Sequence, residues 1–147
     1  MGLGYGFLAD DPVEHGFGGS LHLTYGLTDA FNGLLEIDIT GHPSDGLMIA
    51  SGSIGVGNVF DVLQWVPYVG LMAGGYDLWT VDAECGTDLT VACHRGRIGG
   101  SIPFGLDYQL SRSFAVGAQG RVHLLLLGDS PVMYVTAFAR AEVLWGY

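Results

Sequence analysis

The stretch "NGLLEIDITG", residues 32–41, decides the fold because it places two acidic residues inside an apolar run. Glu36 and Asp38 stand two positions apart. An α-helix would turn residues at this spacing to different faces, whereas a β-strand sends both to the same face. The opposite face then carries three aliphatic residues, Leu35, Ile37 and Ile39. The stretch therefore predicts a strand with one acidic face and one aliphatic face.

The composition favours a protein that turns apolar surface outward. Hydrophobic residues make up 49% of the 147 positions and charged residues only 14%, compared with about 25% charged residues in an ordinary soluble domain. No apolar run reaches the length of about 18 residues that indicates a transmembrane helix. An unusually apolar soluble β-protein and a membrane β-barrel remain, and the barrel explains more of the composition. The length predicts a single domain, residues 1–147.

The charge balance excludes one class of partner. The formal net charge is −10 and lysine is absent, so nucleic acid is not an expected partner. The 25 glycines fit strands that coil around a narrow barrel. The opening "MGLGYGF" has no basic segment or cleavage site, which predicts a mature chain with an added initiator methionine.

Period-two alternation between apolar and polar residues recurs along the whole chain and predicts eight strands. Their expected ranges are 2–8, 16–26, 31–40, 47–59, 65–79, 97–110, 114–127 and 132–147. An even number of strands closes a barrel with both termini on one side of a membrane. The pattern does not decide which face of 65–79 turns inward.

The connections fall into two sets that alternate along the chain. The short set contains "TDA", "FDVLQ" and "SRS"; the other set contains "ADDPVEH", "GHPSDG", "GDSP" and the longest connection, residues 80–96. Short periplasmic turns and longer external loops are typical of outer-membrane barrels. The predicted fold is therefore all-β, an eight-stranded antiparallel up-and-down transmembrane β-barrel with both termini on the periplasmic side.

Three segments carry a resemblance to a known family: "YGLTDAF" (25–31), "YQLSRSF" (108–114) and "AFARAEVLWGY" (137–147). With them the chain resembles the small eight-stranded outer-membrane barrels of Gram-negative bacteria, the OmpA/OmpX-like group. Family members more often end in Phe, but the last strand resembles the C-terminal signal that the barrel assembly machinery reads. The residues that carry this signal are Val143, Trp145 and Tyr147. The resemblance implies a bacterial outer-membrane location, with membrane lipids and the assembly machinery as partners, and implies no particular activity.

In such a barrel the lumen side of each strand is polar and the lipid side is apolar. The sequence then predicts a polar lumen network, and its candidate residues are His22, Glu36, Asp38, Asp107, Arg121, His123, Arg140 and Glu142, with Arg97 also facing inward. We expect ion pairs around Arg121, Arg140, Glu36 and Glu142, since an unpaired charge inside would be prohibitive. The network is interpreted as a packed core that fixes register. The alternative is a gate that rearranges to pass ions or water, as has been proposed for the family. Eight strands leave room for side chains only.

Cys85 and Cys93 lie in the longest predicted connection. The cell envelope is oxidising, so a disulfide between them is expected. A thiolate metal site with His94 is the alternative, but two Cys and one His at this spacing match no common zinc pattern. No metal or cofactor is predicted.

Enzymatic activity is not predicted. "GHPSD", residues 41–45, supplies His42, Ser44 and Asp45, but residues this close in a turn are more typical of turn formation than of a catalytic triad. A soluble ligand-binding barrel of the lipocalin type would carry apolar residues inside and lysines outside, whereas this chain lacks lysine and turns aliphatic residues outward. The predicted function is a monomeric protein with a structural or interaction role in the envelope. Narrow permeation, a lipid-A-modifying enzyme and a soluble ligand binder are the alternatives.

Overall fold

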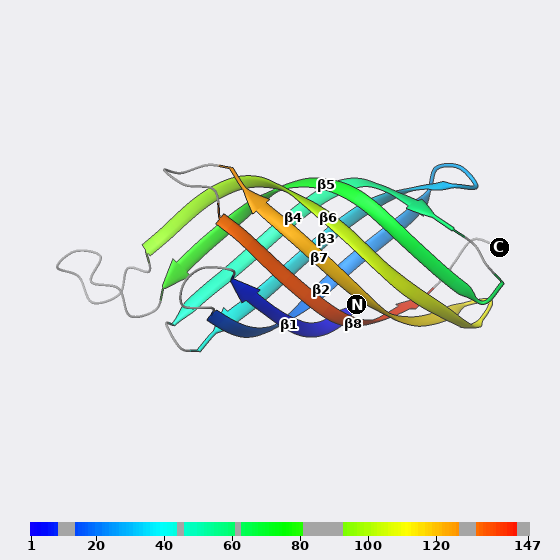
Figure 1. Cartoon of the computed structure of the whole chain (residues 1–147), viewed down its shortest axis with the longest axis horizontal. Coiled ribbons are helices and arrows are strands. Elements are labelled where there is room, and N and C mark those ends of the chain that lie inside the picture. Colours follow the sequence, from blue (N-terminus) through cyan, green and yellow to red (C-terminus); the bar gives the residue numbers. More distant parts are fainter. Residues whose placement is uncertain (9–13, 44–45, 61–62, 81–92, 127–131, 144–147) are drawn as a thin grey trace.

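The structure is a closed ring of eight antiparallel strands (Figure 1). It is a computed structural model that describes residues 1–8, 14–43, 46–60, 63–80, 93–126 and 132–143. The strands are β1 (Gly2–Leu8), β2 (Glu14–Gly26), β3 (Phe31–His42), β4 (Leu47–Val59), β5 (Trp65–Thr80), β6 (Cys93–Ser111), β7 (Phe114–Leu125) and β8 (Val132–Val143). Each strand pairs with its neighbour in the chain, and β1 closes the ring on β8. No helix in these ranges is long and apolar enough to cross a membrane.

The predicted all-β, eight-stranded, up-and-down architecture is confirmed. Three predicted connections were drawn too wide. Residues 14–15, expected in the first connection, already belong to β2. His42, expected in a turn, is the last residue of β3 and is buried. Residues 93–96, expected in the long connection, already belong to β6, because Thr80 pairs with Cys93 and extends the β5–β6 ladder. The three corrections have one cause, since backbone pairing continues past the point where the alternation of apolar and polar residues fades.

The side chains of residues 32–41 alternate between the two faces of β3 as the sequence predicted. On β3, Glu36 and Asp38 are buried while Ile37 between them is 59% exposed. The facing of β5, which the sequence left undecided, is also resolved. Its inward side carries Tyr68, Met72 and Tyr76, and its outward side carries Val69 and Leu71. Both faces of this strand are apolar, which is why the period-two signal was weak.

The two ends of the barrel differ. We call the end where β1, β3, β5 and β7 finish the loop end, at the left of Figure 1, and the opposite end the turn end. At the turn end, the amino group of Met1 donates a hydrogen bond to the carbonyl of Ala141 at 2.8 Å. The first residue of the chain therefore lies against the end of β8 at the turn end.

Inward glycines make room for large polar side chains in the narrow ring. A Cβ atom at Gly105 would overlap the hydroxyl of Tyr68, and one at Gly117 would overlap the carboxylate of Asp107. Both neighbours belong to the lumen network described below. The glycine content thus reflects close approach of side chains across the interior.

Gly105→Ala is expected to lower the free energy of unfolding by about 1–3 kcal/mol, because the added methyl group overpacks the lumen against Tyr68. The measurement is the urea midpoint of the detergent-refolded protein. Gly52→Ala is the matched control, since Gly52 is exposed and a Cβ there meets nothing within 4 Å. Equal midpoints for the two variants would contradict the packing argument.

Candidate functional site: the polar lumen

Arg121 on β7 forms the deeper of two ionic clusters inside the barrel. Its Nη2 atom lies 3.0 Å from Oε2 of Glu36, and its Nη1 atom lies 3.0 Å from Oδ2 of Asp38. Ser51 donates a further hydrogen bond to the same Asp38 oxygen at 2.6 Å. The Arg121 side chain is fully buried. One guanidinium therefore holds two carboxylates from β3 in a space that excludes water.

Arg140 on β8 forms the second cluster, nearer the turn end. Its Nη2 atom lies 2.8 Å from Asp107 and 2.9 Å from Glu142. Its Nη1 atom donates to the hydroxyl of Tyr68 at 2.7 Å, and its Cζ atom lies 4.7 Å from the centre of the Tyr68 ring. His22 approaches this cluster, with Nε2 at 3.9 Å from Oε1 of Glu142.

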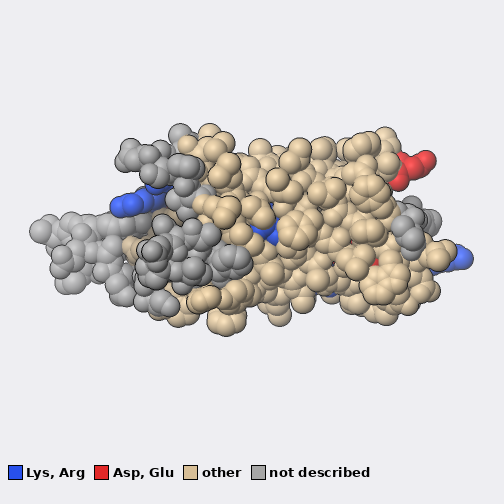
Figure 2. Space-filling view, viewed as in Figure 1, with Lys and Arg blue, Asp and Glu red and all other residues tan. Residues whose placement is uncertain are grey.

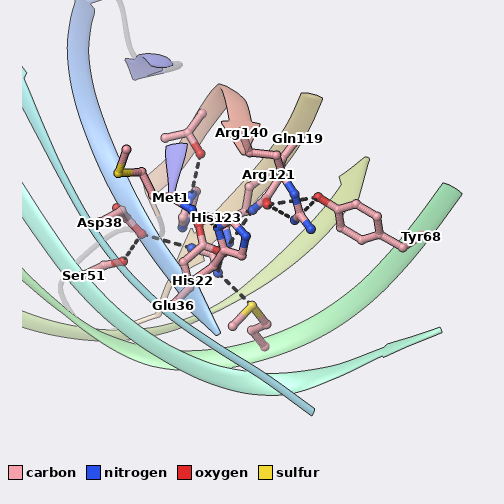
Figure 3. A network of polar contacts seen from close by, with 12 residues as sticks. Met1, His22, Glu36, Asp38, Ser51, Tyr68, Gln119, Arg121, His123 and Arg140 are labelled. Carbon is pink, nitrogen blue, oxygen red and sulfur yellow. Dashed lines mark hydrogen bonds and ion pairs between the residues drawn. The ribbon is translucent and has the colours of Figure 1, made fainter. Parts of the chain in front are cut away.

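Gln119 joins the two clusters (Figure 3). Its amide nitrogen donates to both carboxylate oxygens of Glu36, at 3.3 and 3.1 Å. Its amide oxygen accepts hydrogen bonds from Arg140 and Tyr68, each at 3.0 Å. A single neutral side chain on β7 thereby links partners from β3, β5 and β8. Such a link fixes the strands around the ring relative to one another.

A third polar group lies nearer the loop end and contains no charged side chain. His123 contacts the hydroxyl of Tyr76 at 3.0 Å and the hydroxyl of Thr136 at 3.2 Å. Thr40 and Tyr134 form a hydrogen bond between their hydroxyl groups. These bonds join β3, β5, β7 and β8 on the loop-end side of the two ionic clusters.

Little space remains between the two ionic clusters. The cavity bordered by His22, Glu36, Tyr68, Gln119 and Arg140 has a volume of about 10 Å³. That is about the room one water molecule needs. Among the described residues, no group of three or more His, Cys, Asp or Glu side chains could hold a metal ion.

The structure brings together most of the side chains that the sequence placed in the lumen network. Glu36, Asp38 and Arg121 meet in one cluster, and Asp107, Arg140 and Glu142 meet in the other. His22 borders the second cluster, while His123 belongs to the uncharged group. The expected pairing was incomplete, because Asp38 and Asp107 contact an arginine as directly as Glu36 and Glu142 do. Arg97 lies half-buried near the start of β6, next to Gly96, which pairs with Asp77.

Other predicted sites fall at or beyond the edge of the described ranges. Cys85 lies outside them, so the Cys85–Cys93 disulfide stays a prediction, although Cys93 itself begins β6. Trp145 and Tyr147 of the expected assembly signal also lie outside them. Val143, the remaining residue of that signal, ends β8 with its side chain exposed.

Sequence reasoning missed two side chains that organise the lumen. Gln119 alternates in phase with Arg121 and His123, but it was not among the candidates because these are all ionisable residues. Tyr68 was missed because both faces of 65–79 read as apolar. One signal for both is Gly105, which pairs with Gln119 and leaves room for the hydroxyl group of Tyr68.

Comparison with known proteins places this architecture among solved structures. No family model matches the sequence, and no curated protein matches it either. Neisserial surface protein A superposes with a TM-score of 0.81 at 13% identity, covering 97% of this chain and 92% of its own. Ail, the attachment invasion locus protein of Yersinia pestis, gives 0.63 at 17% identity, covering 97% and 94%. The N-terminal β-barrel domain of Pseudomonas aeruginosa OprF gives 0.60 at 16% identity, covering 96% and 99%.

The chain has the fold of the small outer-membrane β-barrels. The family resemblance inferred from the sequence is confirmed at this level. Because all three identities are low, the likeness concerns the fold alone, and the function must be argued from this chain's own residues.

Arg121→Ala is expected to lower the free energy of unfolding by about 3–5 kcal/mol, because it leaves the carboxylates of Glu36 and Asp38 buried without their cation. Urea unfolding of the refolded barrel measures this loss. Arg112→Ala is the control, since Arg112 is exposed in the connection between β6 and β7, where a change within about 0.5 kcal/mol is expected.

A charge-neutral variant separates loss of an ion pair from loss of packing. Arg121→Met combined with Glu36→Gln and Asp38→Asn removes the guanidinium and both carboxylates together. This triple variant is expected to be more stable than Arg121→Ala, since it buries no uncompensated charge. If it were the less stable of the two, packing by Arg121 would matter more than its charge.

Proposed function

We propose that this protein is an integral outer-membrane β-barrel with a structural or interaction role in the bacterial cell envelope. The observation that carries the proposal is the inverted distribution of side chains: ion pairs inside and aliphatic residues outside. That distribution is stable only where the outer surface faces hydrocarbon instead of water.

The outward surface is apolar over the whole middle of the barrel. Exposed aliphatic side chains occur on successive strands, among them Leu21 (63%), Ile37 (59%), Ile54 (68%) and Leu71 (65%). A water-soluble monomer rarely exposes a contiguous apolar patch of more than a few hundred Å². A band that passes around the ring in this way fits a lipid environment.

Charged residues avoid this band. Among the residues whose exposure the structure describes, the exposed charged side chains are Asp29, Arg95 and Arg112, which lie in turns or near the start of β6. Figure 2 shows the same arrangement on one face, where protruding acidic and basic side chains lie toward the two ends and the broad middle is almost entirely uncharged.

Aromatic residues gather near the turn end, where the apolar band ends. Tyr25, Phe31 and Trp65 are each about half exposed or more. The Trp65 and Tyr108 rings lie 4.8 Å apart, and the Tyr108 hydroxyl donates to Gln64 at 2.7 Å. Aromatic girdles of this kind mark the two membrane interfaces of outer-membrane barrels.

The filled lumen favours a structural or interaction role over permeation. Two arginines, their four carboxylates and Gln119 occupy the cross-section, with a cavity of only about 10 Å³ between them. Passage of an ion would require these pairs to separate inside a water-poor space. Planar-bilayer recordings of the refolded protein should therefore show no steady conductance. Narrow permeation remains the second candidate, favoured by the polar character of the network.

An enzymatic role has less support. The sequence offered His42, Ser44 and Asp45 as its only catalytic set, and His42 is 1% exposed, with its ring 6.0 Å from that of Tyr134. A histidine in this position packs inside the barrel and faces no membrane lipid. Analysis of lipid A after incubation with the protein should show no acyl-chain change.

A soluble ligand-binding barrel fits the geometry least well. Small-molecule pockets usually measure about 300–1,000 Å³ and are lined mainly by apolar side chains. The lumen cavity is far smaller and is bordered by ionic groups. Membrane lipids and the barrel assembly machinery remain the proposed partners, with a monomer as the proposed state and both termini on the periplasmic side.

The first measurement is electrophoretic mobility of the detergent-refolded chain, boiled against unboiled. A closed barrel resists the detergent of the gel, so the unboiled sample is expected to migrate differently from the heat-unfolded one. A chain that folds without detergent and shows no such difference would overturn the membrane assignment.

Ile37→Arg tests the lipid-facing surface directly. Ile37 is at the middle of β3, where an arginine facing lipid is expected to cost about 2–4 kcal/mol. Leu63→Arg is the matched control, because Leu63 is 90% exposed in the connection between β4 and β5. A cost of about 0–1 kcal/mol is expected there. Unfolding in lipid vesicles by urea measures both, and a neutral Ile37→Arg would mean that this face meets water.

A further inference from the structure

A cluster of apolar side chains crosses the lumen between the polar network and the loop end. Its four buried members come from β4, β5, β7 and β8, and each is at most 4% exposed: Ile49, Tyr76, Leu125 and Tyr134. Leu47 and Leu78 pack against them. We call the four buried residues the apolar layer.

The two tyrosines of the apolar layer make its two sides different. Their rings belong to the layer, but their hydroxyl groups bond to polar partners of the network. Tyr76 contacts His123 at 3.0 Å, and Tyr134 bonds to Thr40. The layer is thus fixed to the polar core on one side. Its other side meets the aliphatic Leu47 and Leu78 and the buried ring of His42, which lies 6.0 Å from that of Tyr134.

Exposure of the charged side chains falls steadily from the turn end toward this layer. Glu142 is 16% exposed, Arg140 and Asp107 are 8% exposed, and Glu36 is 5% exposed. Asp38 and Arg121, which lie closest to the layer, are both 0% exposed. At the level of the layer, Arg97, which pairs with Tyr76 on β5, is half-buried again. The driest part of the lumen is therefore the part next to the apolar layer.

We infer that the apolar layer is a barrier that closes the lumen toward the loop end, so that hydrophilic solutes approach the ionic network from the turn end only. An apolar constriction excludes water and ions because they lose hydration without gaining polar contacts. Exclusion of water also strengthens the ion pairs of Arg121. The inference rests on the barrel interior and does not depend on the proposed membrane location.

The layer also adds a second obstacle to permeation. Separation of the Arg140 and Arg121 ion pairs would open the polar part of the lumen, but the apolar layer would still block the loop end. A gate made of ion pairs alone is therefore insufficient to explain closure in this barrel.

Thiol labelling in detergent micelles tests the barrier. The reporter is Ser51→Cys, on the same face of β4 as Ile49, in a chain that also carries Cys85→Ser and Cys93→Ser. The probe is a cationic methanethiosulfonate reagent. The filled space around Gln119 prevents the reagent from reaching position 51 from the turn end. Slow labelling is expected, whereas a Gln109→Cys reporter, half-buried at the turn end, is expected to react fast.

Opening the layer with Ile49→Ala and Leu125→Ala is expected to raise the labelling rate of the Ser51→Cys reporter at least about tenfold, equivalent to 1.4 kcal/mol. The rate at position 109 should stay unchanged. The matched control is Ile54→Ala with Leu124→Ala, which removes the same atoms from the outward faces of the same strands. This control is expected to leave both rates unchanged.

Two results would overturn the barrier. One is fast labelling at position 51 with the layer intact; the other is an unchanged rate after opening. The heat-dependent mobility shift is recorded for each variant, so a failure of the barrel itself is distinguished from a failure of the inference. If the double variant does not fold, Ile49→Val and Leu125→Val singly should each give a smaller increase.

Discussion

The pairing of charge inside a ring of only eight strands is the constraint on which the rest of the structure depends. Two guanidinium groups face four carboxylates in a space that excludes water almost completely. A charge in such a place must be paired and hydrogen-bonded or it destabilises the fold by several kcal/mol. Arg121, Arg140 and Gln119 satisfy this requirement by joining strands that are far apart in sequence. Closure of the ring and pairing of the charges are thus one event, since neither cluster forms until β3 faces β7 and β6 faces β8 across a common interior.

That interior also explains the composition. Tyr68 and Asp107 fit only because the strands beside them carry glycine at Gly105 and Gly117. Polar side chains face inward and aliphatic side chains face outward. The charged residues that face inward are therefore gathered in the narrow interior, where they form ion pairs. The same inversion that makes the outer surface unsuited to water makes the lumen unsuited to an apolar ligand. Function in such a molecule is sought on its surfaces and at its ends more than in its centre.

The lumen is not uniform along its axis. Ionic groups near the turn end retain some exposure, those near the middle have none, and an apolar layer follows toward the loop end. Water is excluded progressively, so each cluster experiences a different effective dielectric and its charges interact with different strength. An eight-stranded barrel can therefore be polar inside without offering a continuous polar path.

The sequence by itself determined the fold class, the number of strands, their order and the face that each acidic residue of "NGLLEIDITG" occupies. These follow from local rules, because the period of two along a strand is set by the backbone and is visible wherever the two faces differ in polarity. It also indicated which charged residues turn inward. Only the tertiary structure decided which arginine meets which carboxylate, that Gln119 joins the two clusters, that Tyr68 rather than Leu71 faces the lumen, and that an apolar layer closes one end. Those outcomes depend on register and strand tilt around the closed ring, which bring together residues far apart in sequence, such as Thr40 and Tyr134, 94 positions apart. No local pattern carries that information.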